Sequence, residues 1–544
     1  MINLTKSLIV LLSLTGVSFA STLKIGTLQS IGQFYPSKQT IGESNFIRNL
    51  INPPIIAVSD DQEWECIVCT KIPTIANGKL EINTKKKDSE EDPKAALVSH
   101  WEISPSFSWD DGKPVTGLDV KFTYAHLKSQ GAKLPDVNIQ IDHKNPRRFS
   151  VHYKAARPDF YQAFAFSLLP VQKSQLVKKL ALPDENLQTT LAYSKGISYG
   201  PYKISYMDGD LVLQENNFYR GLKNDFKTIE ILEAKNKAQL KASIAKQKIH
   251  MLADGVLDYE DIRTLTQDSS IRPNWKFVHS LGKTTDLLVF NLKNPYLADL
   301  KLRQAILHSI DRESLLSDIF DNYGAVSPLS PFESKKNSVN QPSYNLLKAQ
   351  RILESSGWSF SNESKGSKLE LNLIYNKDKL KNKIATRIRS HLGALGIKVN
   401  LKGIKDPAIF LERLQKGNYR DLALISIKTF PNMPLGELFH SAAIPSKKND
   451  YTGSNFNYWS NNRVDQALEE LDYTYDIKMR KTILNKISNA YIEDIPAIPL
   501  MVRPHFGLIS ANMVNVHFPG YGYHSSLMSS GWSTLEQETR PGLF

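Results

Sequence analysis

The chain is poor in cysteine and has no long apolar run. Two cysteines, Cys66 and Cys69, occur in 544 residues, and no stretch approaches the roughly 20 apolar residues that a transmembrane helix needs. The motifs H-E-x-x-H and G-x-S-x-G are absent. Gly282-Lys283-Thr284 fails as a P-loop, because the first glycine of that motif would fall on Phe277. We therefore expect neither an enzyme nor a membrane-spanning protein, and no catalytic residue, metal site or cofactor.

The two cysteines have the spacing C-x-x-C. A zinc site needs two further ligands, and there is no second C-x-x-C or nearby histidine pair. The segment Trp64 to Thr70 has the pattern of an extended or turning chain rather than the helix start of a thioredoxin site. In an oxidising compartment we favour a local disulfide between Cys66 and Cys69 over two free thiols. The bridge would need a turn, since residues i and i+3 of a strand face opposite ways.

Acidic residues are too few to balance the basic ones, which leaves a formal net charge of +13. The excess is spread along the chain. The densest basic run, Lys85-Lys86-Lys87, is followed at once by Asp88, Glu90, Glu91 and Asp92. Such a mixed segment is typical of a solvated loop, so we expect no nucleic-acid partner.

The first 20 residues have the pattern of a secretory signal peptide. Lys6 precedes an apolar core from Leu8 to Leu14, and Ser18-Phe19-Ala20 places small residues where a signal peptidase cleaves. We expect cleavage between Ala20 and Ser21. No cysteine follows that position, so the sequence gives no sign of a lipid anchor. A protein exported to the periplasm, in a cell with two membranes, is the expectation.

Alternating strand and helix patterns run along the chain. Residues 369–375 alternate as a strand, and Ile384, Ile388, Leu392 and Leu395 recur at helical spacing. Residues 397–401 alternate again, which makes a β-α-β crossover and a parallel strand pair. Further helices are predicted at 299–309, 311–320, 345–356 and 476–491, and a buried strand at 421–425. The fold class is therefore α/β.

A strand-turn-helix corner lies between Trp109 and Val120. Asp111-Gly112 supplies the turn, and Thr116 with Asp119 predicts a capping box at a helix start. Two other local interpretations concern later residues: Arg303 is expected to pair with an acid such as Asp311, and Pro496 is expected to end a helix by disfavouring helical geometry in Ile495.

Several motifs in this order resemble one family, the large extracellular solute-binding proteins of the oligopeptide/dipeptide/nickel class (family 5) that serve ABC importers. They cover nearly the whole chain beyond residue 20. The matching segments are the corner from Trp101 to Val120, Ser198-Tyr199-Gly200-Pro201-Tyr202, Asn291 with the block Asp299 to Glu313, Tyr344 to Trp358, Val464 to Leu468, and Asp494 to Leu500.

The resemblance implies a two-lobed periplasmic-binding-protein fold (Venus flytrap) with an extra inserted domain. It also implies that a pair of strands crossing between domains I and III acts as a hinge. The implied division is a signal peptide at 1–20, domain I at 21–62, 198–284 and 500–544, domain II as an insertion at 63–197, and domain III at 285–499.

The same resemblance implies binding rather than chemistry. Peptides, or a related small solute, are captured between two lobes and delivered to the membrane permease of an ABC transporter. Two alternatives stay open: a peptide-binding chaperone or sensor subunit that is not coupled to import, and a carrier of a non-peptide solute such as a chelated metal. We expect a monomer.

Candidate ligand contacts follow from one departure from the family pattern. The family's peptide-binding members carry an Asp after the strand that resembles 421–427 here, and it pairs the peptide amino terminus. Thr429 stands in that place, beside Lys428 and with Phe430 in the aromatic position, which favours capped peptides, anionic ligands or another anchor. Lys428 pointing to solvent remains an equal alternative, and the aromatics of Phe34-Tyr35 are either cleft residues or lobe packing. The expected contacts are Phe34, Tyr35, Ser426, Ile427, Lys428, Thr429, Phe430 and Asn432.

Overall fold

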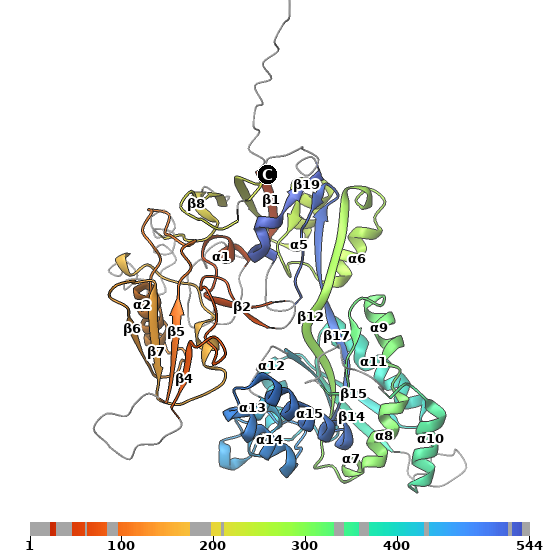
Figure 1. The fold of residues 1–544 in the computed structure, drawn as a ribbon. Helices are drawn as coiled ribbons and strands as arrows, with labels where there is room; N and C mark the ends of the chain where they lie inside the picture. The colour runs from red at the N-terminus through yellow and green to blue at the C-terminus, as the bar shows by residue number, and fades with distance from the viewer. Residues whose placement is uncertain are drawn as a thin grey trace, which may run out of the picture.

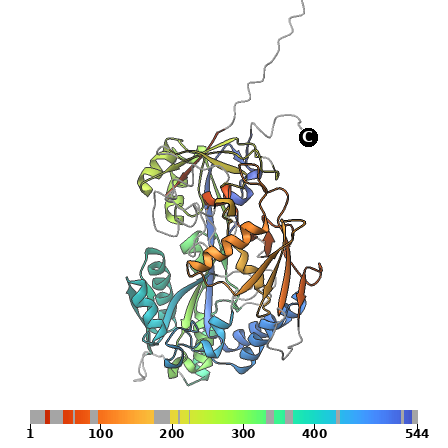
Figure 2. The same cartoon turned by 90° about the vertical axis from the view of Figure 1, so that its left-hand side faces the viewer.

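A long two-stranded ladder joins an upper and a lower lobe, and a smaller β-rich unit lies beside them (Figures 1 and 2). The structure is a computed structural model. It describes residues 22–28, 46–59, 63–83, 96–173, 197–207, 211–222, 224–330, 342–357, 369–428, 435–520 and 525–535.

The strands fall into one large sheet and three smaller ones within the described residues. Their bounds are β1 Thr22–Thr27, β2 Ile56–Val58, β3 Trp64–Cys66, β4 Leu80–Ile82, β5 Leu97–Glu102, β6 Val137–Ile141, β7 Arg148–Tyr153, β8 Tyr202–Met207, β9 Leu211–Glu215, β10 Thr228–Glu233, β11 Met251–Leu252, β12 Trp275–Phe290, β13 Ala325–Val326, β14 Glu370–Asn376, β15 Lys398–Ile404, β16 Leu422–Lys428, β17 Ala497–Ser510, β18 Met513–Val514 and β19 Ser533–Thr534.

The helices cover the faces of the sheets. Their bounds are α1 Phe46–Ile51, α2 Gly117–Ser129, α5 Lys237–Ala245, α6 Tyr259–Gln267, α7 Pro295–Ala298, α8 Leu300–Ser309, α9 Arg312–Phe320, α10 Leu346–Ser355, α11 Lys379–Ala394, α12 Pro407–Gln415, α13 Leu435–Phe439, α14 Asn462–Tyr473 and α15 Ile477–Asp494. None of the described helices combines the length and the apolarity that crossing a bilayer requires.

One sheet runs through both lobes. Its strand order is β15-β14-β16-β12-β17-β11-β1-β10-β9-β8, and β13 pairs with β17. We call β1 and β8 to β11, with α1, α5 and α6, the upper lobe, and β14 to β16, with α7 to α15, the lower lobe. The long antiparallel strands β12 and β17 connect them. The expected boundaries 284/285 and 499/500 fall inside these two strands, and the division into three domains remains a prediction.

The lower lobe is a sheet covered on both faces. The predicted β-α-β crossover is confirmed, because β14 and β15 pair in parallel on either side of α11. Apolar residues of α8 to α11 share one core with one face of the sheet, whereas those of α13 to α15 share a second core with the other. A parallel sheet needs cover on both faces, and the run Leu422 to Ile425 of the inner strand β16 is accordingly apolar, whereas β14 and the edge strand β15 alternate.

The β unit contains the sheet β4-β5-β7-β6, with α2 packed on it. The predicted turn and helix start are confirmed: Gly112 adopts φ +87°, and the backbone N–H of Thr116 donates to the Asp119 carboxylate at 2.8 Å. That carboxylate lies in the protein interior, and burial raises its pKa. Trp109 is almost fully buried there, so the corner belongs to the core of the β unit.

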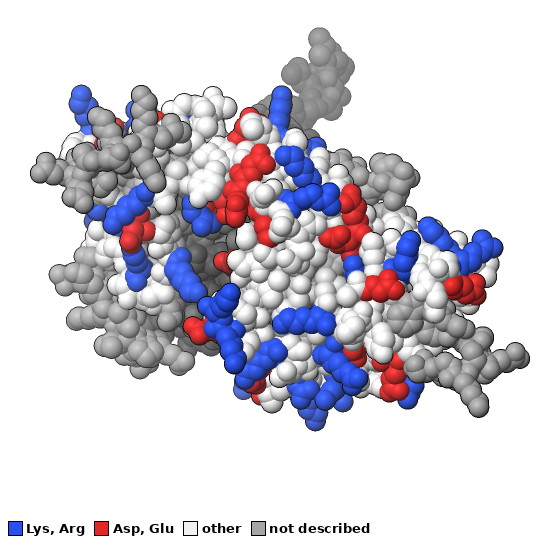
Figure 3. Space-filling view, turned by 90° about the horizontal axis from the view of Figure 1, so that it is seen from below, with Lys and Arg blue, Asp and Glu red and all other residues white. Residues whose placement is uncertain are grey.

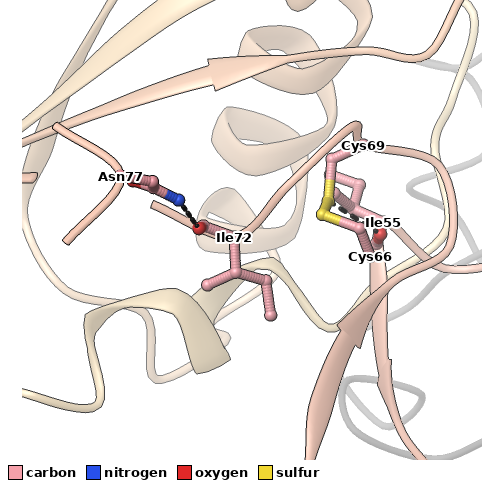
Figure 4. The surroundings of a disulfide bond; sticks show 5 residues. All are labelled: Ile55, Cys66, Cys69, Ile72 and Asn77. Carbon is pink, nitrogen blue, oxygen red and sulfur yellow. Dashed lines mark hydrogen bonds between the residues drawn. A yellow bond between two sulfur atoms is a disulfide. The ribbon is translucent and has the colours of Figure 1, made fainter. Parts of the chain in front are cut away.

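The sulfurs of Cys66 and Cys69 are joined in a disulfide (Figure 4). The chain bends after β3, which brings the two Cα atoms to 5.0 Å. The Cys69 Sγ lies 3.5 Å from the carbonyl oxygen of Ile55, the residue directly before β2. Further along the chain, the side-chain amide of Asn77 donates to the carbonyl oxygen of Ile72. The bridge therefore fixes a turn at the edge of the β unit.

Arg303 has a different partner from the one expected. Its guanidinium donates to backbone carbonyls, not to Asp311: the Nη2 to the Asp494 oxygen at 2.6 Å, the Nε to that oxygen and the Ile495 oxygen, and the Nη1 to the Leu297 and Ala298 oxygens. The last carbonyls of a helix have no partners within it, and here they belong to the ends of α7 and α15. Asp311 instead caps α9 through its bond from the Ser314 N–H. The helix stop is confirmed, since α15 ends at Asp494 and Ile495 is left-handed.

Replacing Arg303 by methionine should destabilise the lower lobe by about 3 kcal/mol, because several buried carbonyl oxygens lose their donors. Urea unfolding followed by circular dichroism measures the change. Lys301→Met, at an exposed position of the same helix, is the matched control and should alter the free energy of unfolding by less than about 0.5 kcal/mol. Equal effects of the two substitutions would contradict this role of Arg303.

Candidate functional site

The described part of the expected ligand site is the end of β16. Strand β16 pairs antiparallel with β12, so that Ser426 lies opposite Asp286, Ile427 opposite Thr285 and Lys428 opposite Thr284. Because β14 and β16 are parallel, both end at the edge of the lower lobe nearest the upper lobe. The carboxyl ends of parallel strands are where α/β lobes bind ligands.

Asp286 is the centre of a buried polar cluster at this edge. Its side chain is 0% exposed, and one carboxylate oxygen accepts a bond of 2.7 Å from the Lys381 Nζ. The Nε and Nη2 of Arg503 donate to the two carboxylate oxygens at 2.8 Å each. The Ser426 Oγ donates to the same carboxylate at 2.7 Å. One anion thus holds two cations and a hydroxyl from α11, β17 and β16.

The charges of this cluster depend on one another. Burial by itself raises the pKa of Asp286, but Lys381 and Arg503 outweigh burial, and the pKa lies below its ordinary value. Burial lowers the pKa of Lys381, which Asp286 only partly offsets. For Arg503 the bonds and charge of Asp286 overcome the effect of burial and raise the pKa. With all three groups ionised, the cluster carries a net charge of +1 at the junction of the lobes.

The ladder changes register beside this cluster. The pairing of β12 with β17 shifts between Leu281 and Thr285, and again between Asp286 and Leu287. At Gly282 a Cβ atom would lie 2.6 Å from the Arg503 carbonyl oxygen, so only glycine allows this approach. Bulges of this kind bend a strand and interrupt its pairing. The segment around Gly282 is therefore the part of the ladder that bends most easily between the lobes.

A second contact between the lobes lies near the ladder, between α6 and the helices α9 and α11. The Lys383 Nζ of α11 donates to the Glu260 carboxylate of α6 at 2.5 Å. Tyr259 donates from its hydroxyl to Asp321, after α9, at 2.5 Å. A pocket of about 250 Å³ lies between these helices. This contact resists relative rotation of the lobes without touching β16.

Ile425 and Ile427 face away from the cluster. They line a small apolar pocket of about 30 Å³ together with Phe439 and Tyr491. Alternation along β16 explains the difference, since Ser426 and Lys428 point to the α11 side and the two isoleucines to the α15 side. Of the expected contacts, Ser426 is exposed but bonds to the buried Asp286 carboxylate, Lys428 is exposed, and Ile427 packs against the second core.

The other expected residues lie outside the described part of the chain. They are Phe34, Tyr35, Thr429, Phe430 and Asn432, together with the expected cleavage site at Ala20 and Ser21. Viewed from below, the surface is hollowed between the β unit and the lower lobe, and Lys and Arg side chains lie along the rim of that hollow (Figure 3). Within the described residues, no group of three His, Cys, Asp or Glu side chains is arranged to hold a metal ion.

Sequence reasoning missed Asp286, Lys381 and Arg503, although two of them leave a signal. Asp286 is a charged residue directly before the apolar run Leu287 to Phe290, and buried carboxylates need partners. Lys381 lies three residues before Ile384, on the apolar stripe of its helix. A charged residue at a core position of a strand or helix indicates that it forms an ion pair, but the sequence does not identify its partner.

The comparison with protein families decides the identity of this architecture. Residues 94–437 match the model of bacterial extracellular solute-binding proteins, family 5. The chain belongs to this family. The matched residues therefore include β5, α2, β6 and β7 of the β unit, the strand β12 and the sheet of the lower lobe.

Individual relatives agree with the family. The oligopeptide-binding protein AppA of Bacillus subtilis is 24% identical over 474 residues, which is 83% of each chain. The nickel-binding protein NikA of Staphylococcus aureus is 26% identical over 337 residues, 59% of this chain and 63% of that one. The structure of HbpA2 from Haemophilus parasuis has a TM-score of 0.72 at 16% identity and covers 94% of this chain and 100% of that one. The predicted two-lobed α/β fold is confirmed, and the relatives AppA and NikA are named for binding rather than catalysis.

Asp286→Asn should lower the free energy of unfolding by about 3 kcal/mol at neutral pH, because it leaves Lys381 and Arg503 without their anion. The pKa of Asp286 is depressed in the folded state, so its contribution is fully present above the unfolded pKa of about 3.9. That contribution is lost as the pH falls through the folded value. Urea unfolding at several pH values should show the difference between the two proteins shrink in acid.

The matched control is Asp318→Asn, which removes an exposed carboxylate paired with Arg387 at 2.8 Å. We expect it to cost less than about 1 kcal/mol, as for other surface pairs. An Asp286→Asn protein as stable as the wild type at neutral pH would refute the view that this cluster holds the hinge strands to the lower lobe.

Proposed function

We propose that this protein captures peptides, or a related small solute, between its two lobes outside the cytoplasm and delivers them to the permease of an ABC importer. The observation that carries the proposal is the hinge: two strands of one sheet cross between lobes, and their pairing is interrupted beside the end of β16. Hinged lobes that close over a solute shift toward the closed state when the solute binds there.

The class of solute is inferred from the relatives. AppA of Bacillus subtilis is named an oligopeptide-binding protein and NikA of Staphylococcus aureus a nickel-binding protein. We favour peptides, since the peptide-binding relative spans more of the chain. A carrier of a chelated metal is the second candidate, and a chaperone or sensor that is not coupled to import is the third.

The proposal extends to compartment, assembly and site. Residues 1–20 act as a signal peptide cleaved between Ala20 and Ser21, and the mature protein works as a monomer without nucleic acid. Domain I comprises 21–62, 198–284 and 500–544, domain II 63–197 and domain III 285–499. Phe34, Tyr35, Lys428, Thr429, Phe430 and Asn432 contact the solute, and the cluster around Asp286 orients Ser426 at the edge of the cleft.

Native mass spectrometry of protein purified from its own compartment tests the solute class. A heterogeneous set of bound short peptides is the expected result. One anionic small molecule in every complex would contradict the peptide proposal, and a chelated metal would support the second candidate.

The substitution Thr429→Asp should raise the affinity for peptides with a free amino terminus by about tenfold, because a carboxylate would then pair the terminal ammonium group. Isothermal titration calorimetry with a peptide and its acetylated form makes the comparison. The acetylated peptide is the control and should gain nothing. Unchanged affinity for the free peptide would refute the placement of Thr429 at the anchor position.

A further inference from the structure

The lower lobe also touches the β unit, away from the ladder (Figures 1 and 2). Tyr475 lies in the short loop between α14 and α15, and its ring packs against the core of the β unit. That core is formed by the apolar residues of the β4-β5-β7-β6 sheet, α2 and the segment around Phe160. A residue of the lower lobe therefore completes the core of another body, across the opening between them.

The loop that carries Tyr475 is held rigidly by its own lobe. Arg480, in the first turns of α15, donates from its Nη1 to the carbonyl oxygen of Leu471 at 2.7 Å and to that of Thr474 at 2.8 Å. These bonds fix the backbone immediately before Tyr475. The tyrosine is presented to the β unit as a preorganised contact, so little conformational entropy is lost when the two surfaces meet.

Charged groups surround this contact on both sides. Arg157 of the β unit donates from Nε and Nη2 to the two oxygens of Asp159, each at 2.9 Å. These bonds, together with the charges of Asp472 and Glu437 in the lower lobe, raise the pKa of Arg157. The lower lobe thus attracts Arg157, but Arg157 is largely exposed and solvent weakens that attraction.

The hydroxyl of Tyr475 is buried without a hydrogen-bond partner among the described residues. Burial raises the pKa of Tyr475 to about 12. A buried hydroxyl that has lost water and gained no partner opposes the contact that buries it. Separation of the two surfaces would return the hydroxyl to water, so the ring favours contact and the hydroxyl favours separation.

We propose that Tyr475 is the positioning residue of a latch between the β unit and the lower lobe. Its ring holds the cleft closed, and its unpaired hydroxyl keeps the latch weak enough to open. The latch sets the ratio of closed to open protein and acts on the solute only through that ratio. The inference rests on the proposed function for its purpose, since closure over a solute is the step that it governs.

Two substitutions of Tyr475 should act in opposite directions. Tyr475→Ala removes the partly buried ring and should lower the ratio of closed to open protein by about tenfold. Tyr475→Phe keeps the ring and removes the unpaired hydroxyl, so it should raise this ratio several-fold. A residue with only a structural role would not give opposite signs, because both changes would then act on folding alone. Tyr473→Ala is the matched control: Tyr473 is 76% exposed, two positions away, and its loss should leave the ratio unchanged.

The ratio is measured in the full-length, solute-free protein by electron–electron double resonance between two spin labels. Exposed Lys144 in the β unit and Lys448 in the lower lobe are suitable positions. Attachment through unnatural amino acids leaves the Cys66–Cys69 disulfide intact. Urea unfolding of each variant shows that the altered distances come from folded protein.

Short distances that lengthen in Tyr475→Ala and become more populated in Tyr475→Phe would support the latch. Unchanged distances in both variants, or a shift in the same direction, would overturn it. Because no solute is added, this result is independent of peptide binding. Distances that respond as expected in a protein that captures no peptide would leave the latch standing and refute the proposed function instead.

Discussion

The pairing of β12 with β17 constrains everything else in this molecule. Both strands run through the upper and the lower lobe, so any movement of one lobe against the other must bend this ladder. Its regular hydrogen bonds resist bending, except where the register shifts beside Gly282 and Asp286. Between the two shifts, the Asp286 carboxylate binds side chains from β17, β16 and α11. The lower end of the ladder is thus part of the lower lobe, and bending is confined to the few residues above it.

Buried cations give the lower lobe this rigidity. Arg303, Arg312 and Lys381 are each at most 6% exposed, which would be costly without partners. Arg303 satisfies the end of α15, and Arg312 donates to the carbonyl oxygens of Ser327 and Pro499, on either side of the β13 and β17 pairing. Lys381 joins α11 to Asp286. Each cation ties a helix to β12, to β17 or to the chain just before β17, so the helices and the sheet move together, and relative motion of the lobes takes the form of a hinge.

Local patterns predicted much of the fold, because their causes are local. The alternation in β14 and β15, the apolar stripe of α11 and the capping box at Thr116 each need only neighbouring residues. The cluster at the hinge depends on contacts of long range: Asp286 meets Lys381 across 95 positions and Arg503 across 217. A charged residue in an apolar pattern indicates that an ion-pair partner exists, but the pattern does not identify that partner. Arg303 shows the same limit, since the carbonyls that end a helix satisfied it where the sequence suggested a carboxylate.

The contact at Tyr475 is tied to the hinge by the energetics of closure. A solute shifts a hinged protein only by the difference between its affinities for the closed and the open form. If the closed form dominated in the empty protein, the solute would lose access to its site. The apparent affinity would then equal the intrinsic affinity multiplied by the fraction of protein that is open. A contact made of charges alone would depend on the ionic strength outside the cell. A contact of one aromatic ring with one unsatisfied hydroxyl is less sensitive to salt, and its favourable and unfavourable contributions to closure nearly cancel. Binding of the solute then determines whether the protein is closed or open.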